Sequence, residues 1–164
     1  MSADSPTPIV ASTEGGGTGD MAPGTPLRVL VVDDEPSMCR AMSLSLAWYG
    51  LEAVAVDSAE AALAALETQQ FDVLLVDLRL RGVRGDALYE AVVARQPALR
   101  ERTLFMTGDI SAEAERAIAA TNCPYLRKPF DITLAIQAIY ARAARSIAPR
   151  SLPARDERSD ELQH

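Results

Sequence analysis

The chain has 164 residues, of which 48% are hydrophobic, enough for one domain with its own core and for additional tails. Its formal net charge of -7 argues against nucleic acid as a direct partner, because binding to a phosphate backbone requires clustered Lys and Arg. No apolar run approaches the ~20 residues that cross a bilayer. The N-terminus lacks both the basic start and the apolar core of a signal peptide, so we expect a cytoplasmic protein without membrane contact.

Three residue positions stand out in the composition. Cys39 and Cys123 form no CxxC pattern and have no paired His, so we expect two reduced, partly buried structural thiols. Lys128 is the single Lys among 16 basic residues. In such an Arg-rich chain, the position that keeps a Lys is a candidate for a compact ammonium on a flexible stem.

The chain divides into three parts by composition. Residues 1–25 are rich in Gly, Ser, Thr and Pro without apolar periodicity, which predicts a disordered N-terminal extension. Residues 26–145 alternate strand-like and helix-like segments with short joins, as in a parallel sheet wrapped by helices. Residues 146–164 contain Pro149, Pro153 and alternating charges, which predict a disordered C-terminal tail.

The alternating segments predict five strand-helix units. The strands are expected over residues 27–32, 51–56, 71–77, 103–107 and 124–127, with 51–56 at an edge of the sheet. The helices are expected from Pro36 to about Trp48, and after the caps Ser58, Asp86, Ser111 and Asp131, the third stopping before Pro97 and the fourth near Asn122. The helix after Ser58 is expected to be built on Ala61, Leu63, Ala64 and Leu66. Together they predict an α/β fold with a doubly wound parallel sheet of strand order 2-1-3-4-5.

The strand over residues 71–77 is the centre of this scheme. Its apolar residues follow one another without alternation, which is typical of a strand covered by helices on both faces. Asp77 ends the strand, and ligands of open α/β sheets bind outside the carboxyl ends of their strands. A strand-terminal Asp is also a common turn former and helix cap, so this residue alone does not define a site.

Other polar residues follow the carboxyl ends of neighbouring strands. Asp33 and Asp34 follow the first strand, Thr107 ends the fourth, and Lys128 follows the fifth. In the order 2-1-3-4-5 the first and third strands are neighbours, which brings Asp33, Asp34 and Asp77 within a few ångströms. Three clustered carboxylates repel one another, and oxygen ligands of this kind favour Mg²⁺, with the ammonium of Lys128 opposite for a phosphoryl group. Taken singly, the acids before Pro36 could be capping residues and Thr107 an ordinary strand residue.

Four motifs carry a resemblance to a known family. They are Val31–Pro36 (VVDDEP), Val76–Leu78 with Gly85 eight positions after the acid, Phe105–Gly108 (FMTG) and Tyr125–Phe130 (YLRKPF). From about Leu27 to Arg145 the chain resembles a single-domain, CheY-like response-regulator receiver domain of two-component signalling, which has the flavodoxin-like fold. It departs from the family at Arg81, where receiver domains commonly have Pro four residues after the phosphoacceptor.

The resemblance implies a role for each residue of the motifs. Asp77 would accept the phosphoryl group, Lys128 would contact the acyl phosphate, and Thr107 would form a conformational switch with Tyr125. The implied Mg²⁺ ligands are Asp33, Asp34, Asp77 and the backbone carbonyl of Arg79. The protein would not be an enzyme acting on a separate substrate, but a phosphoacceptor that assists its own phosphorylation and slow dephosphorylation. The signal would leave through the face formed by the helix after Ser111, the fifth strand and the last helix.

The phosphoryl donor would be another protein, a sensor histidine kinase or a histidine phosphotransfer protein, because the only His is His164 in the predicted tail. Since no output domain is expected in the remaining residues, the moved face would act on a separate target protein or in a phosphorylation-dependent homodimer. A phosphatase of the haloacid dehalogenase type is disfavoured, because Arg79 stands where those enzymes have a second acid. A pseudo-receiver that only docks remains the alternative, and a mass shift with a small phosphodonor would decide.

Overall fold

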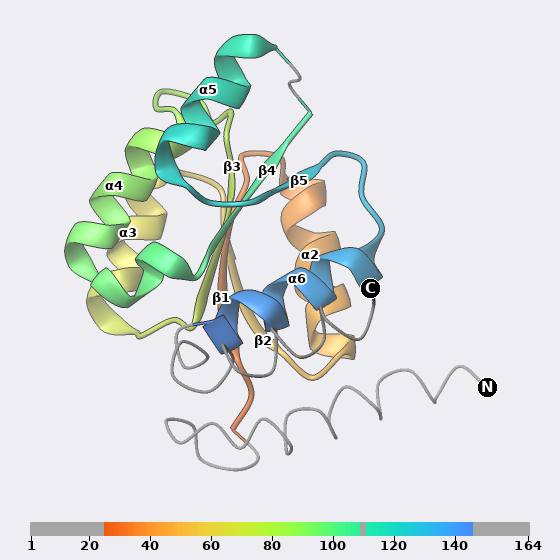
Figure 1. Cartoon of the computed structure of the whole chain (residues 1–164). Coiled ribbons are helices and arrows are strands. Elements are labelled where there is room, and N and C mark those ends of the chain that lie inside the picture. Colours follow the sequence, from red (N-terminus) through yellow and green to blue (C-terminus); the bar gives the residue numbers. More distant parts are fainter. Residues whose placement is uncertain (1–24, 109–110, 146–164) are drawn as a thin grey trace, which may run out of the picture.

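The computed structural model describes residues 25–108 and 111–145, and the structural statements below concern these ranges. Within them the chain forms one parallel sheet of five strands between two layers of helices (Figure 1). The strand order is β2-β1-β3-β4-β5, which confirms the order predicted from the sequence. Residues 1–24 of the extension predicted over 1–25, and the whole predicted tail over residues 146–164, lie outside the described residues.

The element bounds agree with the predicted strands and helices to within two residues at most ends. The strands are β1 (Arg28–Val32), β2 (Glu52–Val56), β3 (Val73–Asp77), β4 (Thr103–Thr107) and β5 (Tyr125–Arg127). The helices are α2 (Pro36–Trp48), α3 (Ala59–Thr68), α4 (Gly85–Arg95), α5 (Ala112–Thr121) and α6 (Ile132–Arg145). A 3₁₀ helix, η2 (Pro97–Glu101), joins α4 to β4, and the sequence analysis did not predict it.

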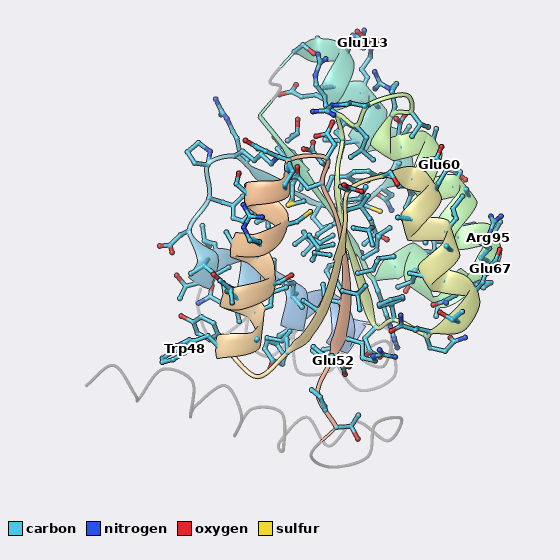
Figure 2. The ribbon with its side chains drawn as sticks, turned by 180° about the vertical axis from the view of Figure 1, so that it is seen from behind. Trp48, Glu52, Glu60, Glu67, Arg95 and Glu113 are labelled. Carbon is cyan, nitrogen blue, oxygen red and sulfur yellow. The ribbon has the colours of Figure 1, made fainter. Side chains whose placement is uncertain are left out.

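The core has two halves, one on each face of the sheet. Helices α3, α4 and α5 cover one face, and α2 and α6 cover the other (Figure 1). Every residue of β3 is buried, which explains its continuous apolar run. The edge strand β2 is only partly buried. Leu44 and Trp48 on α2 are 73% exposed, and Trp48 points away from the molecule at the end of the helix (Figure 2).

Most predicted helix ends are made by the residues that the sequence indicates. Pro36 opens α2, and the hydroxyl oxygens of Ser58 and Ser111 accept hydrogen bonds from backbone N–H groups three residues later, both at 3.1 Å. The carboxylate of Asp131 accepts from the N–H of Thr133 at 3.3 Å. Asn122 ends α5 in the left-handed conformation with φ 63°.

Two predictions about helices were wrong. Asp86 does not cap α4, because the helix already begins at Gly85, and Asp86 instead pairs with the guanidinium of Arg84 at 3.0 Å. The early start follows from the hydrogen bond that the N–H of Gly85 donates to the Leu78 carbonyl at 2.7 Å. In α3, Leu66 is buried and Leu63 packs against the core as predicted, but Ala64 is exposed, and Ala62, which was not predicted, is buried.

Candidate phosphoacceptor and metal site

The strand register brings the predicted acids together at the carboxyl edge of the sheet. Val32 of β1 pairs with Val76 of β3, so Asp33 and Asp77, the next residues along the chain, lie side by side. Asp33, Asp34 and Asp77 each offer a carboxylate oxygen, and these oxygens all lie within 4.8 Å of one another. We call these three residues the acidic cluster. Asp33 and Asp77 are 1% and 7% exposed, so two of its members are removed from bulk water.

Lys128 directly follows β5, which lies two strands from β3, and its side chain reaches across to the cluster. Its backbone N–H donates to the carbonyl oxygen of Thr107 at 2.8 Å, which extends the pairing of β4 and β5 by one residue. The ammonium Nζ then lies 2.8 Å from Asp33 Oδ2 and 2.8 Å from Asp77 Oδ2. The single Lys of the chain therefore bridges the two most buried carboxylates of the cluster.

Backbone groups hold the remaining carboxylate oxygens in place. The N–H of Glu35 donates to Asp33 Oδ1, and the N–H of Arg79 donates to Asp77 Oδ1, both at 2.9 Å. The thiol of Cys39 donates to the carbonyl oxygen of Asp33 at 3.0 Å. These contacts fix the direction of both side chains before any ligand arrives.

Burial and charge act on the titration of this site in opposite directions. Burial raises the pKa of Asp77 above its ordinary value of 3.8, although Lys128 and the N–H of Arg79 partly counter the shift. For Lys128, burial alone would lower the pKa, but the hydrogen bonds to Asp33 and Asp77 prevail, and its pKa is raised. Burial, followed by the charge of Asp33, also raises the pKa of the Cys39 thiol. The ammonium is therefore firmly protonated, while Asp77 holds its charge at a cost.

Asp34, the most exposed acid of the cluster, has a partner that the sequence analysis did not anticipate. The guanidinium Nε of Arg81 lies 3.6 Å from Asp34 Oδ2. Arg81 was recognised only as a departure at the Pro position, and nothing in its sequence pattern indicates the contact, because it depends on the path of the loop after β3. The sequence analysis also missed the contact between Cys39 of α2 and the Asp33 carbonyl.

The chemistry of the cluster fits a small divalent cation. Three carboxylates converge at the edge of the sheet, and oxygen ligands of high charge density are those that Mg²⁺ prefers. Two of the carboxylates are buried, where like charges repel strongly unless a cation compensates them. Asp33, Asp34 and Asp77 are therefore the residues that would hold the ion, and the Arg79 carbonyl remains the predicted fourth protein ligand.

The two predicted switch residues lie on adjacent strands but outside the cluster. Phe105 of β4 pairs with Tyr125 of β5, and Thr107 follows two residues later, so both predicted switch residues are on the sheet face of Phe105. Thr107 is 1% exposed at the end of β4, whereas Tyr125 is 44% exposed. The Tyr125 side chain is therefore partly in solvent, on the sheet face that carries α5.

Comparison with known proteins shows which family the chain is similar to. The family model of the response regulator receiver domain matches residues 29–140. The chain is 35% identical over 133 residues to the virulence sensor protein BvgS of Bordetella bronchiseptica, covering 77% of this chain and 11% of that protein. It is 39% identical over 108 residues to the response regulator protein FleR of Pseudomonas aeruginosa, covering 63% of this chain and 22% of that protein. The chain thus spans less than a quarter of these relatives.

Solved structures agree with the sequence relatives. The chemotaxis response regulator CheY4 of Vibrio cholerae superposes with a TM-score of 0.64 at 26% identity, over 72% of this chain and 99% of that one. A CheY-like receiver domain protein from Methanospirillum hungatei superposes with a TM-score of 0.68 at 23% identity, over 74% and 97%. Among the described helices of the present chain, none has the length and apolar character needed to cross a membrane.

Proposed function

The chain belongs to the response regulator receiver family, and on that basis we propose that Asp77 takes a phosphoryl group from the phosphohistidine of a partner histidine kinase or phosphotransfer protein. The observation that carries the proposal is the position of Lys128, whose Nζ contacts both Asp33 and Asp77 at 2.8 Å beside a third carboxylate. Fixed positive charge at this point is what a transferred phosphoryl group requires.

In the proposed reaction a carboxylate oxygen of Asp77 attacks the phosphorus atom of the donor. The bond between phosphorus and the donor imidazole nitrogen breaks, the donor keeps the electron pair, and an acyl phosphate forms on Asp77. Lys128, freed from the negative charge of Asp77, keeps Asp33 and gains a phosphoryl oxygen as partner. Bound Mg²⁺ would supply the divalent charge that neutralises the approaching phosphoryl oxygens. The N–H of Arg79 holds the other Asp77 oxygen in place during the transfer.

We further propose that the phosphoryl group is sensed through Thr107. A hydrogen bond from its hydroxyl to a phosphoryl oxygen would draw the loop after β4 inward and leave space for the ring of Tyr125. Because Tyr125 is 44% exposed in the present state, its burial would change the surface formed by α5, β5 and α6. A partner can distinguish the two states only by contacting a surface that differs between them, which makes this face the proposed contact surface for the target protein.

The alternative is a pseudo-receiver that binds partners without being phosphorylated. The complete cluster of acids and the bridging Lys128 favour the phosphoacceptor. Phosphorylation-dependent dimerisation through the same face and the cytoplasmic location stay predictions.

Intact mass spectrometry with acetyl phosphate distinguishes the two functions. The wild-type chain in MgCl2 should gain the mass of one phosphoryl group, and Asp77→Asn should gain none. An excess of chelator should suppress the gain, because the clustered carboxylates repel an anionic donor without a divalent cation. A wild-type chain that gains no mass under these conditions, or a gain that persists in Asp77→Asn, would contradict the proposal.

A further inference from the structure

Arg81 contacts the metal-binding edge of the acidic cluster from outside. Its Nε lies 3.6 Å from Asp34 Oδ2, and its side chain is 86% exposed, compared with 24% for Asp34. The residue belongs to the short loop between β3 and α4, in which the following Gly82 has a φ of +85°. Within the described ranges, the ion pair with Asp34 is the contact that holds the guanidinium at the cluster, and most of the side chain lies in solvent.

In the present state each carboxylate of the cluster has a cationic partner. Lys128 serves Asp33 and Asp77, and Arg81 serves Asp34. The oxygen that Arg81 approaches belongs to the residue that also offers an oxygen to the predicted metal site. A cation cannot bind Asp34 at full strength while a guanidinium neutralises the same carboxylate.

We propose that Arg81 is a built-in competitor of Mg²⁺ for Asp34. It compensates the charge of Asp34 in the metal-free protein and leaves when the ion binds. This inference rests on the proposed function, since it takes Asp34 as a ligand of the ion. A Pro at this position, common in the family, provides no such charge, so the competition is a property of this chain.

The exposure of Arg81 determines how much it weakens Mg²⁺ binding and how easily it leaves Asp34. A side chain that is 86% in solvent moves away at little cost, so the ion pair does not block the metal site. Exposed ion pairs are weak, and removing this competitor should tighten Mg²⁺ binding about threefold. Because salt screens exposed charges, the difference between wild type and variant should shrink as ionic strength increases.

Arg84 provides a matched control in the same loop. Its Nε lies 3.0 Å from Asp86 Oδ1 and its Nη1 lies 3.5 Å from Glu113 Oε2, so these partners are outside the acidic cluster. Arg84→Gln removes the same unit of charge close to the site, but it does not remove a competitor from a metal ligand. The pair of variants therefore separates direct competition from the general field of a lost positive charge.

The test is an NMR titration of the full chain with MgCl2, following the amide of Glu35, which donates to Asp33 Oδ1. Arg81→Gln should lower the Mg²⁺ dissociation constant about threefold at low salt and less at high salt, and Arg84→Gln should leave it nearly unchanged. If Arg81→Gln binds Mg²⁺ as wild type does or more weakly, the competitor role is wrong while the metal site stands. Equal tightening in both variants also overturns it, because only the general field would then act. If the wild-type chain shows no Mg²⁺ response, the metal site of the proposed function fails as well.

Discussion

At Asp77 folding makes the ionised carboxylate, which the proposed chemistry needs, less favourable than it is in the unfolded chain. Burial raises the pKa of this residue above 3.8, and Lys128 and the N–H of Arg79 only partly compensate. The metal-free protein therefore stores unfavourable free energy in an ionised Asp77. A divalent cation or a phosphoryl group with its Mg²⁺ would relieve it.

Replacing Asp77 by Asn should accordingly stabilise the metal-free protein at neutral pH, raising Tm by a few degrees. The sign follows from linkage: with a folded pKa above the unfolded one, the cost is fully present above the folded pKa and absent below the unfolded one. The advantage of Asp77→Asn should therefore fade as the pH falls toward 3.8. Thermal melts of both proteins in chelator, over a series of pH values, measure this difference in Tm. An equal or lower Tm for Asp77→Asn at neutral pH would show that burial does not dominate the titration of Asp77.

Replacing Lys128 by Arg tests whether the charge alone or also the shape of the cation matters at the site. Its Nζ lies 2.8 Å from carboxylates of both Asp33 and Asp77, a position suited to a compact ammonium. In Lys128→Arg the charge is kept, but the planar guanidinium cannot occupy the same point. We expect phosphorylation by acetyl phosphate to slow on the order of tenfold, because misplaced groups lose much of their effect. A wild-type rate in Lys128→Arg would show that only charge is required.

At the scale of single residues, the sequence predicts the proximity of side chains whose positions follow from the strands that they end or follow. Asp33, Asp77 and Lys128 directly end or follow parallel strands, and the strand order fixes their proximity. The contact between Arg81 and Asp34 depends instead on a loop path and on freely rotating side chains. The exposure of Tyr125 likewise depends on a side-chain rotamer, which a sequence pattern does not specify.

Among the elements, the start of α4 is fixed by a close approach of backbone to backbone. A Cβ atom on Gly85 would lie 2.3 Å from the carbonyl oxygen of Asp77, and backbone atoms cannot move aside cheaply. Gly85→Ala should therefore destabilise the fold by about 2–3 kcal/mol. It should also disturb phosphorylation, because the strain falls on the phosphoacceptor itself.

Gly108→Ala is the control, since among the described residues its Cβ would meet only Lys128 Cβ at 3.9 Å, an ordinary contact. Urea unfolding measures both variants, and Gly108→Ala should change stability by less than about 0.5 kcal/mol. Similar losses in both variants would argue that the cost comes from the lost glycine flexibility and not from contact with Asp77.

Gln96, at the end of α4, is joined through its buried side chain to α3 and to the segment between α3 and β3. Its amide nitrogen donates to the carbonyl oxygens of Leu66 at 3.1 Å and Gln69 at 2.7 Å, and its amide oxygen accepts from the N–H of Phe71 at 3.2 Å. Gln96→Ala would leave these backbone groups without this partner and should cost about 2–4 kcal/mol.

The exposed Gln70, in the joint between α3 and β3, provides the comparison. Gln70→Ala should change the free energy of unfolding by less than about 0.5 kcal/mol. Hydrogen exchange gives a second measurement, because the Phe71 amide should exchange faster in Gln96→Ala alone. Unchanged Phe71 exchange in Gln96→Ala would mean that the joint is held by packing and not by these hydrogen bonds.

The predictions of helices and strands were right where hydrophobic periodicity and capping residues agreed. They were wrong where a tertiary contact overrode a local preference. Ser58 and Ser111 cap their helices as expected, because the cap is local. Asp86 does not, because the contact of Gly85 with β3 starts α4 earlier. The 3₁₀ helix over Pro97–Glu101 was missed, since a five-residue segment carries no periodic signal.

At the scale of the whole molecule, the order β2-β1-β3-β4-β5 places the acidic cluster and the proposed contact surface on neighbouring strands. Asp77 ends β3 and Thr107 ends β4. Tyr125 begins β5, and Lys128, the residue after β5, contacts the acidic cluster. A change at the phosphoacceptor thus has only two strands to cross before it reaches α5 and α6, which flank that edge in Figure 1. The central claim is that charge added at Asp77 alters this distant face.

The most direct test compares amide shifts of the full chain, free and with beryllofluoride and Mg²⁺, a mimic of the phosphoryl group. We predict changes in the loops after β1 and β3 and also across residues 107 to 135, with none in Asp77→Asn. Changes confined to the loops after β1 and β3, with residues 107 to 135 silent, would contradict the account.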